Sequence, residues 1–411
     1  MKVYLHTFGC RANQYDTELV RGLVQHGGGA IVGSISEADV AVFNSCAVTA
    51  DAVADLRQQV RRAARVSPGI RTVVMGCAAS LDDGSIAALP TVRDVIPGAD
   101  LTQLGRALGV AAAPVRPARQ SGARGLLRIQ EGCDEHCTFC ATTLARGAHR
   151  SRDANALVAE ARALAQHHAE IVLTGIHIGH WGSEHGSSLG ALVQELVAAV
   201  PGVRFRLSSV EATEVDGALR ACLDHPERVA PHLHAPLQSG SDRVLKRMGR
   251  HWYSSRMYRA AIEALVGGRD IFALGADIIT GFPGETDADH EATVALVNAL
   301  PFTYLHVFPW SPRPGTAALA LDGPVAPAVA QARAAELRRM GDAKATDYAR
   351  RRSGGMADVV LVRGDGQLGL TEDYLSVRVA FGGRPRGRGE RFPARLERLD
   401  DGSLIATPLA P

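Results

Sequence analysis

The chain has 411 residues, 46% of them hydrophobic and 21% charged, proportions typical of a soluble globular protein with substantial cores. Its length predicts two or three domains, at ~100–200 residues per domain. No apolar run reaches the ~18 residues that would cross a bilayer, and the start, MKVYLHTFGC, lacks the pattern of a secretory signal. We therefore expect a cytoplasmic protein with no membrane partner. The formal net charge of +2 neither requires nor excludes a nucleic-acid partner.

Short apolar runs alternate with helical stretches over the first hundred residues. Strand-like runs and helical stretches that follow one another in this way predict a parallel α/β sheet. The expected strands cover 3–8, 39–44 and 71–76, and the expected helices cover 16–26 and 50–64. Residues 111–125, rich in Ala, Pro, Arg and Gly, are typical of a linker between domains.

A second series of strand and helix patterns follows the linker. Its helical stretches include 155–165 and 189–200. Six strand–helix units predict a partial (β/α)6 barrel, open because two units of a full eight are missing. A doubly wound sheet is the competing architecture. The six expected strands cover 126–130, 170–175, 203–209, 232–237, 273–281 and 304–309.

The last part of the chain has a different style. Residues 327–352 form an alanine-rich helical stretch, and short strand-like segments separated by turn residues follow it. Such segments predict a small antiparallel β-barrel at the C-terminus. The whole chain is thus an α/β protein with expected domains at 1–110, 125–350 and 351–411.

Cys133, Cys137 and Cys140 form a C-x3-C-x2-C pattern directly after the first strand of the second series. Three soft thiolates so close together can bind three irons of a 4Fe–4S cluster. The fourth iron stays open unless another ligand arrives. An open iron can chelate the amino and carboxylate groups of S-adenosylmethionine (SAM), whose one-electron cleavage gives a 5′-deoxyadenosyl radical. The alternative is a zinc site completed by His136, although a second nearby Cys pair is missing.

Cys10, Cys46 and Cys77 each follow the carboxyl end of an expected strand in the first sheet. Ligands bind at this edge in open α/β folds, so these thiolates predict three corners of a second cluster. The alternative is that they are small buried hydrophobic residues. Cys222, in the helical context ALRACL, is interpreted as a core residue.

Several segments around these cysteines resemble the radical SAM methylthiotransferase family. TFGCRANQYDTE, NSCAVT and MGCAAS resemble the three cluster-binding stretches of its N-terminal domain, and GCDEHCTFC with ARGAHRSR resembles its radical SAM signature. The C-terminal segment is similar to the family's RNA-binding TRAM domain. Further resemblance is found in the barrel segments 232–250, 276–286 and 306–316.

Within the family, TGIHIGHWG at 174–182 and the stretch 306–316 resemble the branch acting on threonylcarbamoyladenosine next to the anticodon of tRNA. The branch acting on isopentenyladenosine usually carries an asparagine-bearing stretch at 177–179, and a third branch modifies a ribosomal-protein aspartate. A hypothesis of another class is an iron–sulfur RNA-binding protein without catalysis. The chain departs from the family at Ala141–Leu144, where a proline is common.

The resemblance implies an enzyme that replaces an aromatic C–H with C–S–CH3, a task that no side-chain acid or base performs and for which proteins use cofactors. It implies two 4Fe–4S clusters and SAM, with the N-terminal cluster carrying the sulfur. The implied partners are tRNA, an electron donor such as flavodoxin or ferredoxin, and a sulfur source. No catalytic side chain is assigned. The residues expected to contact SAM are Phe139, Thr174, Gly175, Ser208, Ser209, Gln238 and Gly281.

Two groups of arginines are candidates for RNA contacts. Arg146, Arg150 and Arg152 suit tRNA phosphates or polar contacts near the radical site, and the alternative is a solvated helix face. The second group is interleaved with Gly and Pro, a composition that suits an RNA-binding groove with stacking aromatic rings, and the alternative is a solvated loop. It consists of Arg384, Arg386, Arg388 and Arg391, flanked by Phe381 and Phe392.

Overall fold

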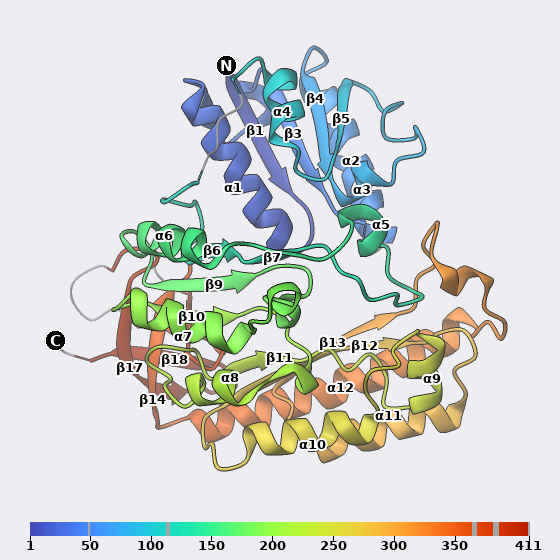
Figure 1. Ribbon diagram of the computed structural model, residues 1–411, viewed down its shortest axis with the longest axis vertical. Helices are drawn as coiled ribbons and strands as arrows, with labels where there is room; N and C mark the ends of the chain where they lie inside the picture. The colour runs from blue at the N-terminus through green and yellow to red at the C-terminus, as the bar shows by residue number, and fades with distance from the viewer. Residues whose placement is uncertain (48–49, 112–115, 364–367, 381–385, 410–411) are drawn as a thin grey trace. The chain divides into compact units, whose positions relative to one another are not determined.

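The computed structural model describes residues 1–47, 50–111, 116–363, 368–380 and 386–409 (Figure 1). The chain forms two compact units. The first consists of Met1–Ala118, Gln130–Arg150 and Ser311–Leu319, and the second of Arg119–Ile129, Ser151–Trp310 and Ala320–Pro411. In the described part of the chain, no helix is long and apolar enough to span a membrane.

The first unit is built on a five-stranded parallel sheet with the order β2-β1-β3-β4-β5. The three predicted strands are its central members and are confirmed. The edge strands β2 and β5 were not predicted from the sequence. The strands are β1 (Lys2–Thr7), β2 (Ala30–Val32), β3 (Val40–Ser45), β4 (Arg71–Gly76) and β5 (Val92–Pro97).

Helices cover both faces of this sheet. Val40 and Val42 of β3 pack with helices α1 and α4, whereas Ala41 and Phe43 pack with α2 and α3. This alternation is the two-residue period of a strand buried on both sides. The helices of the unit are α1 (Arg11–His26), α2 (Ala50–Val66), α3 (Cys77–Ser80), α4 (Leu101–Leu108) and α5 (Thr142–Arg146).

The second unit contains six parallel strands in chain order. They form two three-stranded sheets, β10-β9-β6 and β11-β12-β13, and parallel bridges at Phe205↔Val229 and Ser209↔His234 join these sheets. The order confirms the partial (β/α)6 barrel and excludes the doubly wound alternative. The strands are β6 (Gly125–Arg128), β9 (Glu170–Thr174), β10 (Arg204–Leu207), β11 (His232–His234), β12 (Ala273–Thr280) and β13 (Tyr304–Pro309).

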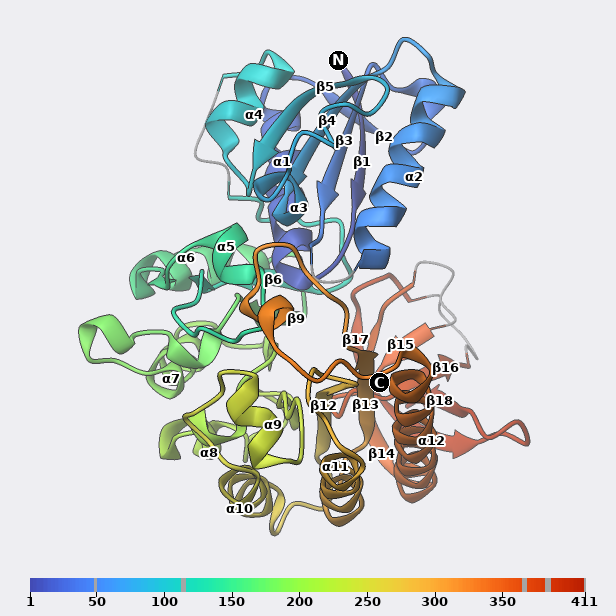
Figure 2. The same cartoon turned by 90° about the vertical axis from the view of Figure 1, so that its right-hand side faces the viewer.

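Helices of this unit lie outside the strands, as Figure 2 shows for α10 and α11. Short strands β7 (Gln130–Glu131) and β8 (Arg150–Ser151) precede and follow the second cysteine segment in the sequence. The helices are α6 (Ala154–Ala165), α7 (Leu189–Ala199), α8 (Gly217–Cys222), α9 (Asp242–Arg247), α10 (Ser255–Val266), α11 (Asp287–Ala299) and α12 (Pro327–Arg352).

The C-terminal segment forms a closed barrel with the order β14-β15-β16-β18-β17. The barrel was predicted, but its expected antiparallel pairing has one exception, because β16 and β18 run parallel. The interior is filled by alternating side chains such as Val359, Phe392, Ala394 and Leu396. Its strands are β14 (Met356–Leu361), β15 (Leu368–Leu370), β16 (Ser376–Val379), β17 (Arg391–Arg398) and β18 (Leu404–Pro408).

Buried ion pairs attach this barrel to the strands of the second unit. Glu170 accepts hydrogen bonds from Arg204 at 2.7 Å and from Arg206 at 2.8 Å. The same arginines donate to the backbone oxygens of Asp358 and Thr371 in the C-terminal barrel. Burial alone would raise the pKa of Glu170, but Arg206 and Arg204 outweigh it and hold the pKa well below its ordinary value. Glu170 therefore holds both arginines in place through its hydrogen bonds.

Candidate metal centres

Three cysteines meet at the carboxyl edge of the first sheet. Cys10 is the N-cap of α1 after β1, Cys46 directly follows β3, and Cys77 begins α3 after β4. Strands β1, β3 and β4 are neighbours in the sheet, so the three thiols come together as the sequence predicted. Parallel strands end at one edge, and this edge is the usual ligand site of open α/β sheets.

Gly9 and Asn13 shape the space around these thiols. Gly9 has φ of +89°, and a Cβ at this position would lie 2.6 Å from Cys46 Sγ. The side-chain oxygen of Asn13 is 3.8 Å from the Sγ atoms of both Cys10 and Cys77. Its amide nitrogen donates to the backbone oxygens of Phe8 and Ser45 at 2.9 and 2.8 Å. Asn13 thus ties together the loops that carry the thiols, a role that the sequence reasoning missed.

The thiols of this triplet lie close enough to affect one another electrostatically. Burial, with a smaller contribution from Cys10 and Cys46, raises the pKa of the Cys77 thiol to about 11 against the opposing effect of Arg146. Mutual repulsion among three thiolates disappears when a metal centre binds them, because the metal's charge inverts the local pKa logic. The donor set, three sulfurs, is the one that iron–sulfur clusters use.

The second cysteine triplet is organised by its own loop. The backbone nitrogen of Cys133 donates to Gly147 at 3.1 Å, and that of Cys140 donates to Cys137 at 3.1 Å. Thr142 at the start of α5 donates its backbone N–H to Cys140 Sγ at 3.3 Å. Burial raises the pKa of Cys133 to about 12, with a further contribution from Cys137 and Cys140. This donor set also fits an iron–sulfur cluster.

The structure gives different environments to the first group of arginines. Arg146 is neither on a solvated face nor free for a phosphate: its side chain is 3% exposed, and it donates to Cys77 Sγ at 3.2 Å. Arg152 donates to the backbone of Arg128 and to Glu160, whereas Arg150 is exposed. The solvated helix face is therefore excluded for Arg146, and the polar contacts that it makes lie beside a cysteine whose position in the sequence is distant and gave no local signal.

Arg313, which the sequence analysis did not single out, also belongs to the first unit. Burial lowers its pKa, and negative charge on Cys46 and Asp51 opposes the shift. Arg313 is only 7% exposed. One arginine therefore interacts with Cys77 and another with Cys46.

The residues predicted to contact SAM fall into both units. Phe139 belongs to the first unit with the cysteines, and the others belong to the second. In the second unit, Thr174 ends β9, and Gln238 has a positive φ of 63°. Three more residues of this group follow the carboxyl ends of β9 and β10, namely Gly175, Ser208 and Ser209.

Gly281 has an explanation within the fold. A Cβ there would lie 2.3 Å from the Cβ of Ala330 in α12, and the backbone nitrogen of Gly281 donates to Glu285 at 2.6 Å. Close packing against α12 thus requires glycine at this position. Packing within the fold accounts for the glycine without the predicted contact with SAM.

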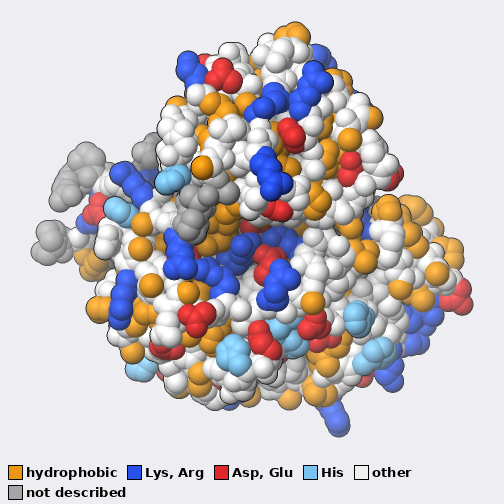
Figure 3. Space-filling model, turned by 45° about the horizontal axis from the view of Figure 1, so that its top comes forward, with side chains coloured by type: hydrophobic (Ala, Val, Ile, Leu, Met, Phe, Trp, Pro, Cys, Tyr) orange, Lys and Arg blue, Asp and Glu red, His pale blue; other side chains and the backbone are white. Residues whose placement is uncertain are grey.

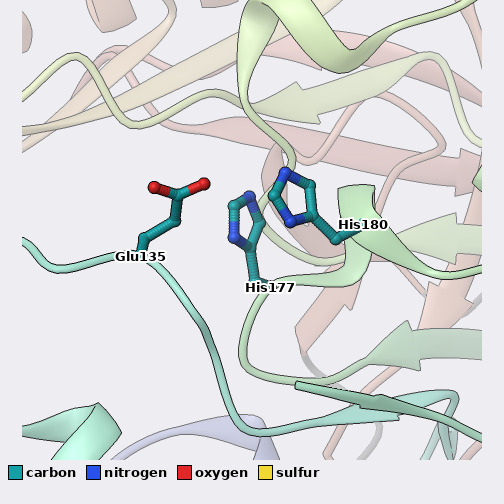
Figure 4. A group of neighbouring side chains, drawn as sticks. All are labelled: Glu135, His177 and His180. Carbon is teal, nitrogen blue, oxygen red and sulfur yellow. The ribbon is translucent and has the colours of Figure 1, made fainter. Parts of the chain in front are cut away.

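Two histidines in the stretch 174–182 share a carboxylate. His177 and His180 lie 2.6 and 3.1 Å from Glu214 Oε1, and their rings stack with centroids 4.0 Å apart (Figure 4). Burial would raise the pKa of Glu214, but the hydrogen bonds from the histidines outweigh it and lower the pKa to about 2. A similar group joins His234 and His306 to Asp277. Each of these carboxylates lies within hydrogen-bonding distance of two imidazoles, and both were missed by the sequence reasoning.

The described arginines of the second group make contacts within the chain. Arg386 pairs with Glu390 at 2.8 Å and lies over the Phe392 ring. Arg388 donates to the backbone oxygens of Val362 and Ser121, and Arg391 pairs with Asp358. Arg384 and Phe381 lie outside the described residues. Figure 3 shows basic, acidic and histidine side chains interspersed on one face.

Comparison with known proteins identifies the class. Residues 2–98 match the uncharacterized protein family UPF0004, and residues 127–297 match the radical SAM superfamily. The fold is similar to that of TsrM, a radical S-adenosylmethionine methyltransferase from Kitasatospora setae, with a TM-score of 0.59 and 14% identity. That similarity covers 77% of this chain and 76% of TsrM. The second segment is therefore a radical SAM domain.

Relatives matched over most of their length define the family. The chain is 32% identical to the threonylcarbamoyladenosine tRNA methylthiotransferase of Aquifex aeolicus, covering 92% of this chain and 96% of that protein. The corresponding Bacillus subtilis protein is 33% identical, with coverage of 91% and 89%. A tRNA-2-methylthio-N(6)-dimethylallyladenosine synthase from Methylobacillus flagellatus is 32% identical, with 84% of each chain covered. The chain belongs to the radical SAM methylthiotransferase family, as its motifs indicated.

Proposed function

We propose that the chain attaches a methylthio group to carbon 2 of N6-threonylcarbamoyladenosine beside the anticodon of tRNA. The observation that carries the proposal is the presence of two cysteine triplets in one compact unit. A protein that only binds RNA has no use for a second open cluster. The full-length similarity to threonylcarbamoyladenosine tRNA methylthiotransferases supports the choice of substrate.

The residues divide this task in a way that their chemistry supports. Cys133, Cys137 and Cys140 would hold one 4Fe–4S cluster, and Cys10, Cys46 and Cys77 the other. When bound, the clusters and SAM supply the 5′-deoxyadenosyl radical and the methylated sulfur. The chain's own residues hold these groups: Asn13 keeps the loops of the first triplet together, and the loop hydrogen bonds of Cys133 and Cys140 position the second.

Binding of SAM is proposed at the carboxyl ends of the barrel strands, the usual ligand face of such barrels. Thr174, Gly175, Ser208, Ser209 and Gln238 follow or end these strands. Phe139 lies between Cys137 and Cys140 in the sequence, and its backbone is proposed to contact SAM. We assign a separate task to each part of the chain. The sulfur-carrying cluster is bound by residues 1–110, the radical chemistry takes place in residues 125–350, and tRNA is bound by residues 351–411.

The proposal also includes partners that the reaction requires. A one-electron donor such as flavodoxin or ferredoxin must reduce the cluster held by Cys133, Cys137 and Cys140. A sulfur source must restore the sulfur consumed in each turnover. Both reactions take place among soluble components, which favours a cytoplasmic location.

Mass spectrometry of nucleosides from bulk tRNA tests the substrate. A strain lacking the protein should lose methylthio-threonylcarbamoyladenosine and accumulate its precursor without the methylthio group. Complementation with the wild-type gene should restore the product, and complementation with the Cys137→Ala variant should not. Loss of methylthio-isopentenyladenosine instead would favour the branch of the Methylobacillus relative. Unchanged tRNA nucleosides would leave the ribosomal-protein or non-catalytic alternative.

A further inference from the structure

Arg146 connects the two cysteine triplets within the first unit. It ends helix α5, whose first residue, Thr142, donates to Cys140 Sγ. The Nε of Arg146 donates to Cys77 Sγ at 3.2 Å. A side chain anchored at the loop of the second triplet therefore contacts a thiol of the first.

The remaining donors of the guanidinium are also used. Nη2 donates to Asn13 Oδ1 and, at 2.8 Å, to Asp16 Oδ2. Nη1 donates to Glu131 at 3.1 Å. The planar fork of an arginine matches such a ring of acceptors, whereas a lysine ammonium does not. Because Asp16 is fully buried, the positive charge of Arg146 also offsets the cost of burying that carboxylate.

The contact with sulfur is the unusual part of this network. A neutral thiol is a weak acceptor, and hydrogen bonds become shorter and stronger when the acceptor is ionised. The hydrogen bond from Nε–H to Cys77 Sγ is therefore strongest when Cys77 is a metal-bound thiolate. An arginine needed only to neutralise Asp16 and Glu131 has no requirement for a sulfur acceptor.

We propose that Arg146 is a positioning residue that orients the Cys77 thiolate and raises the reduction potential of the cluster held by Cys10, Cys46 and Cys77. The inference rests on the proposed function, because it requires Cys77 to be a cluster ligand. Reduction adds a negative charge to a cluster, and a cation with an N–H donor at a ligating sulfur stabilises that added charge. Hydrogen bonds to the sulfurs are among the features that set cluster potentials, and partners of metal ligands tune the metal.

Electron paramagnetic resonance during a redox titration tests this role. The full chain is used with Cys133, Cys137 and Cys140 replaced by Ala, so that the cluster under study titrates alone. The reconstituted background protein is compared with its Arg146→Met and Arg146→Lys variants. Arg62→Met, which changes an exposed arginine of α2 in the same unit, is the matched control.

We expect Arg146→Met to shift the midpoint potential to more negative values and Arg62→Met to leave it unchanged. Arg146→Lys keeps the charge without the fork and should give a smaller shift. A double variant, Arg146→Met with Asp16→Asn, also removes the negative charge of the buried Asp16 side chain, and its midpoint potential should fall between those of Arg146→Met and the background protein. An unchanged potential in the Arg146→Met and double variants overturns the inference while leaving the proposed function intact.

Folding and ligand assignment are controlled separately. If the background protein with intact Cys10, Cys46 and Cys77 binds no cluster, the ligand assignment of the proposed function fails, and the inference fails with it. Thermal melting of the cluster-free forms distinguishes structural damage. Unfolding of all Arg146 variants, the charge-balanced one included, would show a purely structural role and overturn the inference. A folded variant with a shifted potential supports it.

Discussion

Cys133, Cys137 and Cys140 are supplied by one loop, whereas Cys10, Cys46 and Cys77 come from the ends of three neighbouring strands. In the loop, backbone hydrogen bonds within the segment organise the thiols, and all three residues are partly buried. At the sheet edge, Cys10 is exposed, Cys46 is buried, and Cys77 is in between. The sheet-edge site exists only when β1, β3 and β4 are paired, because each strand supplies one of its cysteines.

The difference teaches how each site depends on folding. A short loop closes at a small entropy cost, so the thiols of the second triplet stay near one another even in a loosened chain. The thiols of the first triplet separate when the sheet opens. Binding of a cluster at the sheet edge should therefore stabilise the folded first unit more than binding in the loop, because binding free energy at a site formed by folding is folding free energy.

The largest effect is expected when the loop site of Cys133, Cys137 and Cys140 is removed. Replacing Cys133, Cys137 and Cys140 with Ala should remove about half of the iron, since one of two similar clusters is lost, and should abolish reductive cleavage of SAM. Iron analysis and chromatography of 5′-deoxyadenosine check both expectations. Full iron content in this variant would contradict the assignment.

Breaking the sheet-edge site should leave radical formation in place. Replacing Cys10, Cys46 and Cys77 with Ala should preserve 5′-deoxyadenosine formation and stop methylthio transfer, because the radical centre and the sulfur-carrying centre use separate ligands. Product analysis on threonylcarbamoyladenosine-containing tRNA measures the second effect. Methylthio product from this variant would show that the three cysteines are structural.

A smaller effect is expected when the sheet edge is destabilised by a substitution that leaves all three cysteines in place. Asn13→Leu leaves the backbone oxygens of the partly buried Phe8 and the buried Ser45 without their side-chain donor, and the loss at a buried acceptor costs ~1–3 kcal/mol. We expect lower stability of the first unit and lower iron occupancy at the sheet edge alone. Denaturant titration and iron analysis measure these changes, with Asn298→Leu on the exposed face of α11 as control. Equal effects of both substitutions would contradict the role of Asn13.

The smallest expected effect concerns a region outside both cysteine sites. Arg386 and Arg388 are already bound within the chain, so replacing them with Ala should change tRNA binding little. The slope of log K against log salt should change by less than the ~0.7–0.9 of one phosphate contact per arginine. Binding across a salt series measures this slope. A full change for each arginine would show that both leave their partners to contact phosphate, and 5′-deoxyadenosine formation serves as the unaffected control.

The sequence by itself determined the architecture and the positions of both triplets. Apolar runs that end in cysteine at 10, 46 and 77 placed three thiols at the carboxyl edge of one sheet, because parallel strands end together. The loop triplet was visible as spacing alone. Central strands were predicted since they are long and apolar, whereas β2 (Ala30–Val32) and β15 (Leu368–Leu370) are too short for a pattern to show.

Tertiary structure alone decided what surrounds the thiols. Arg146 lies 69 positions from Cys77 and 130 from Asp16, so its burial and its sulfur contact depend on partners that no local pattern links to it. Gly281 packs against Ala330 of α12, and the parallel pairing of β16 with β18 likewise joins segments that are not successive. Local sequence determines periodicity and turns. Which charged side chains are buried together is decided only when distant segments pack. An unpaired buried charge is costly, so each buried charge needs a partner that packing brings to it.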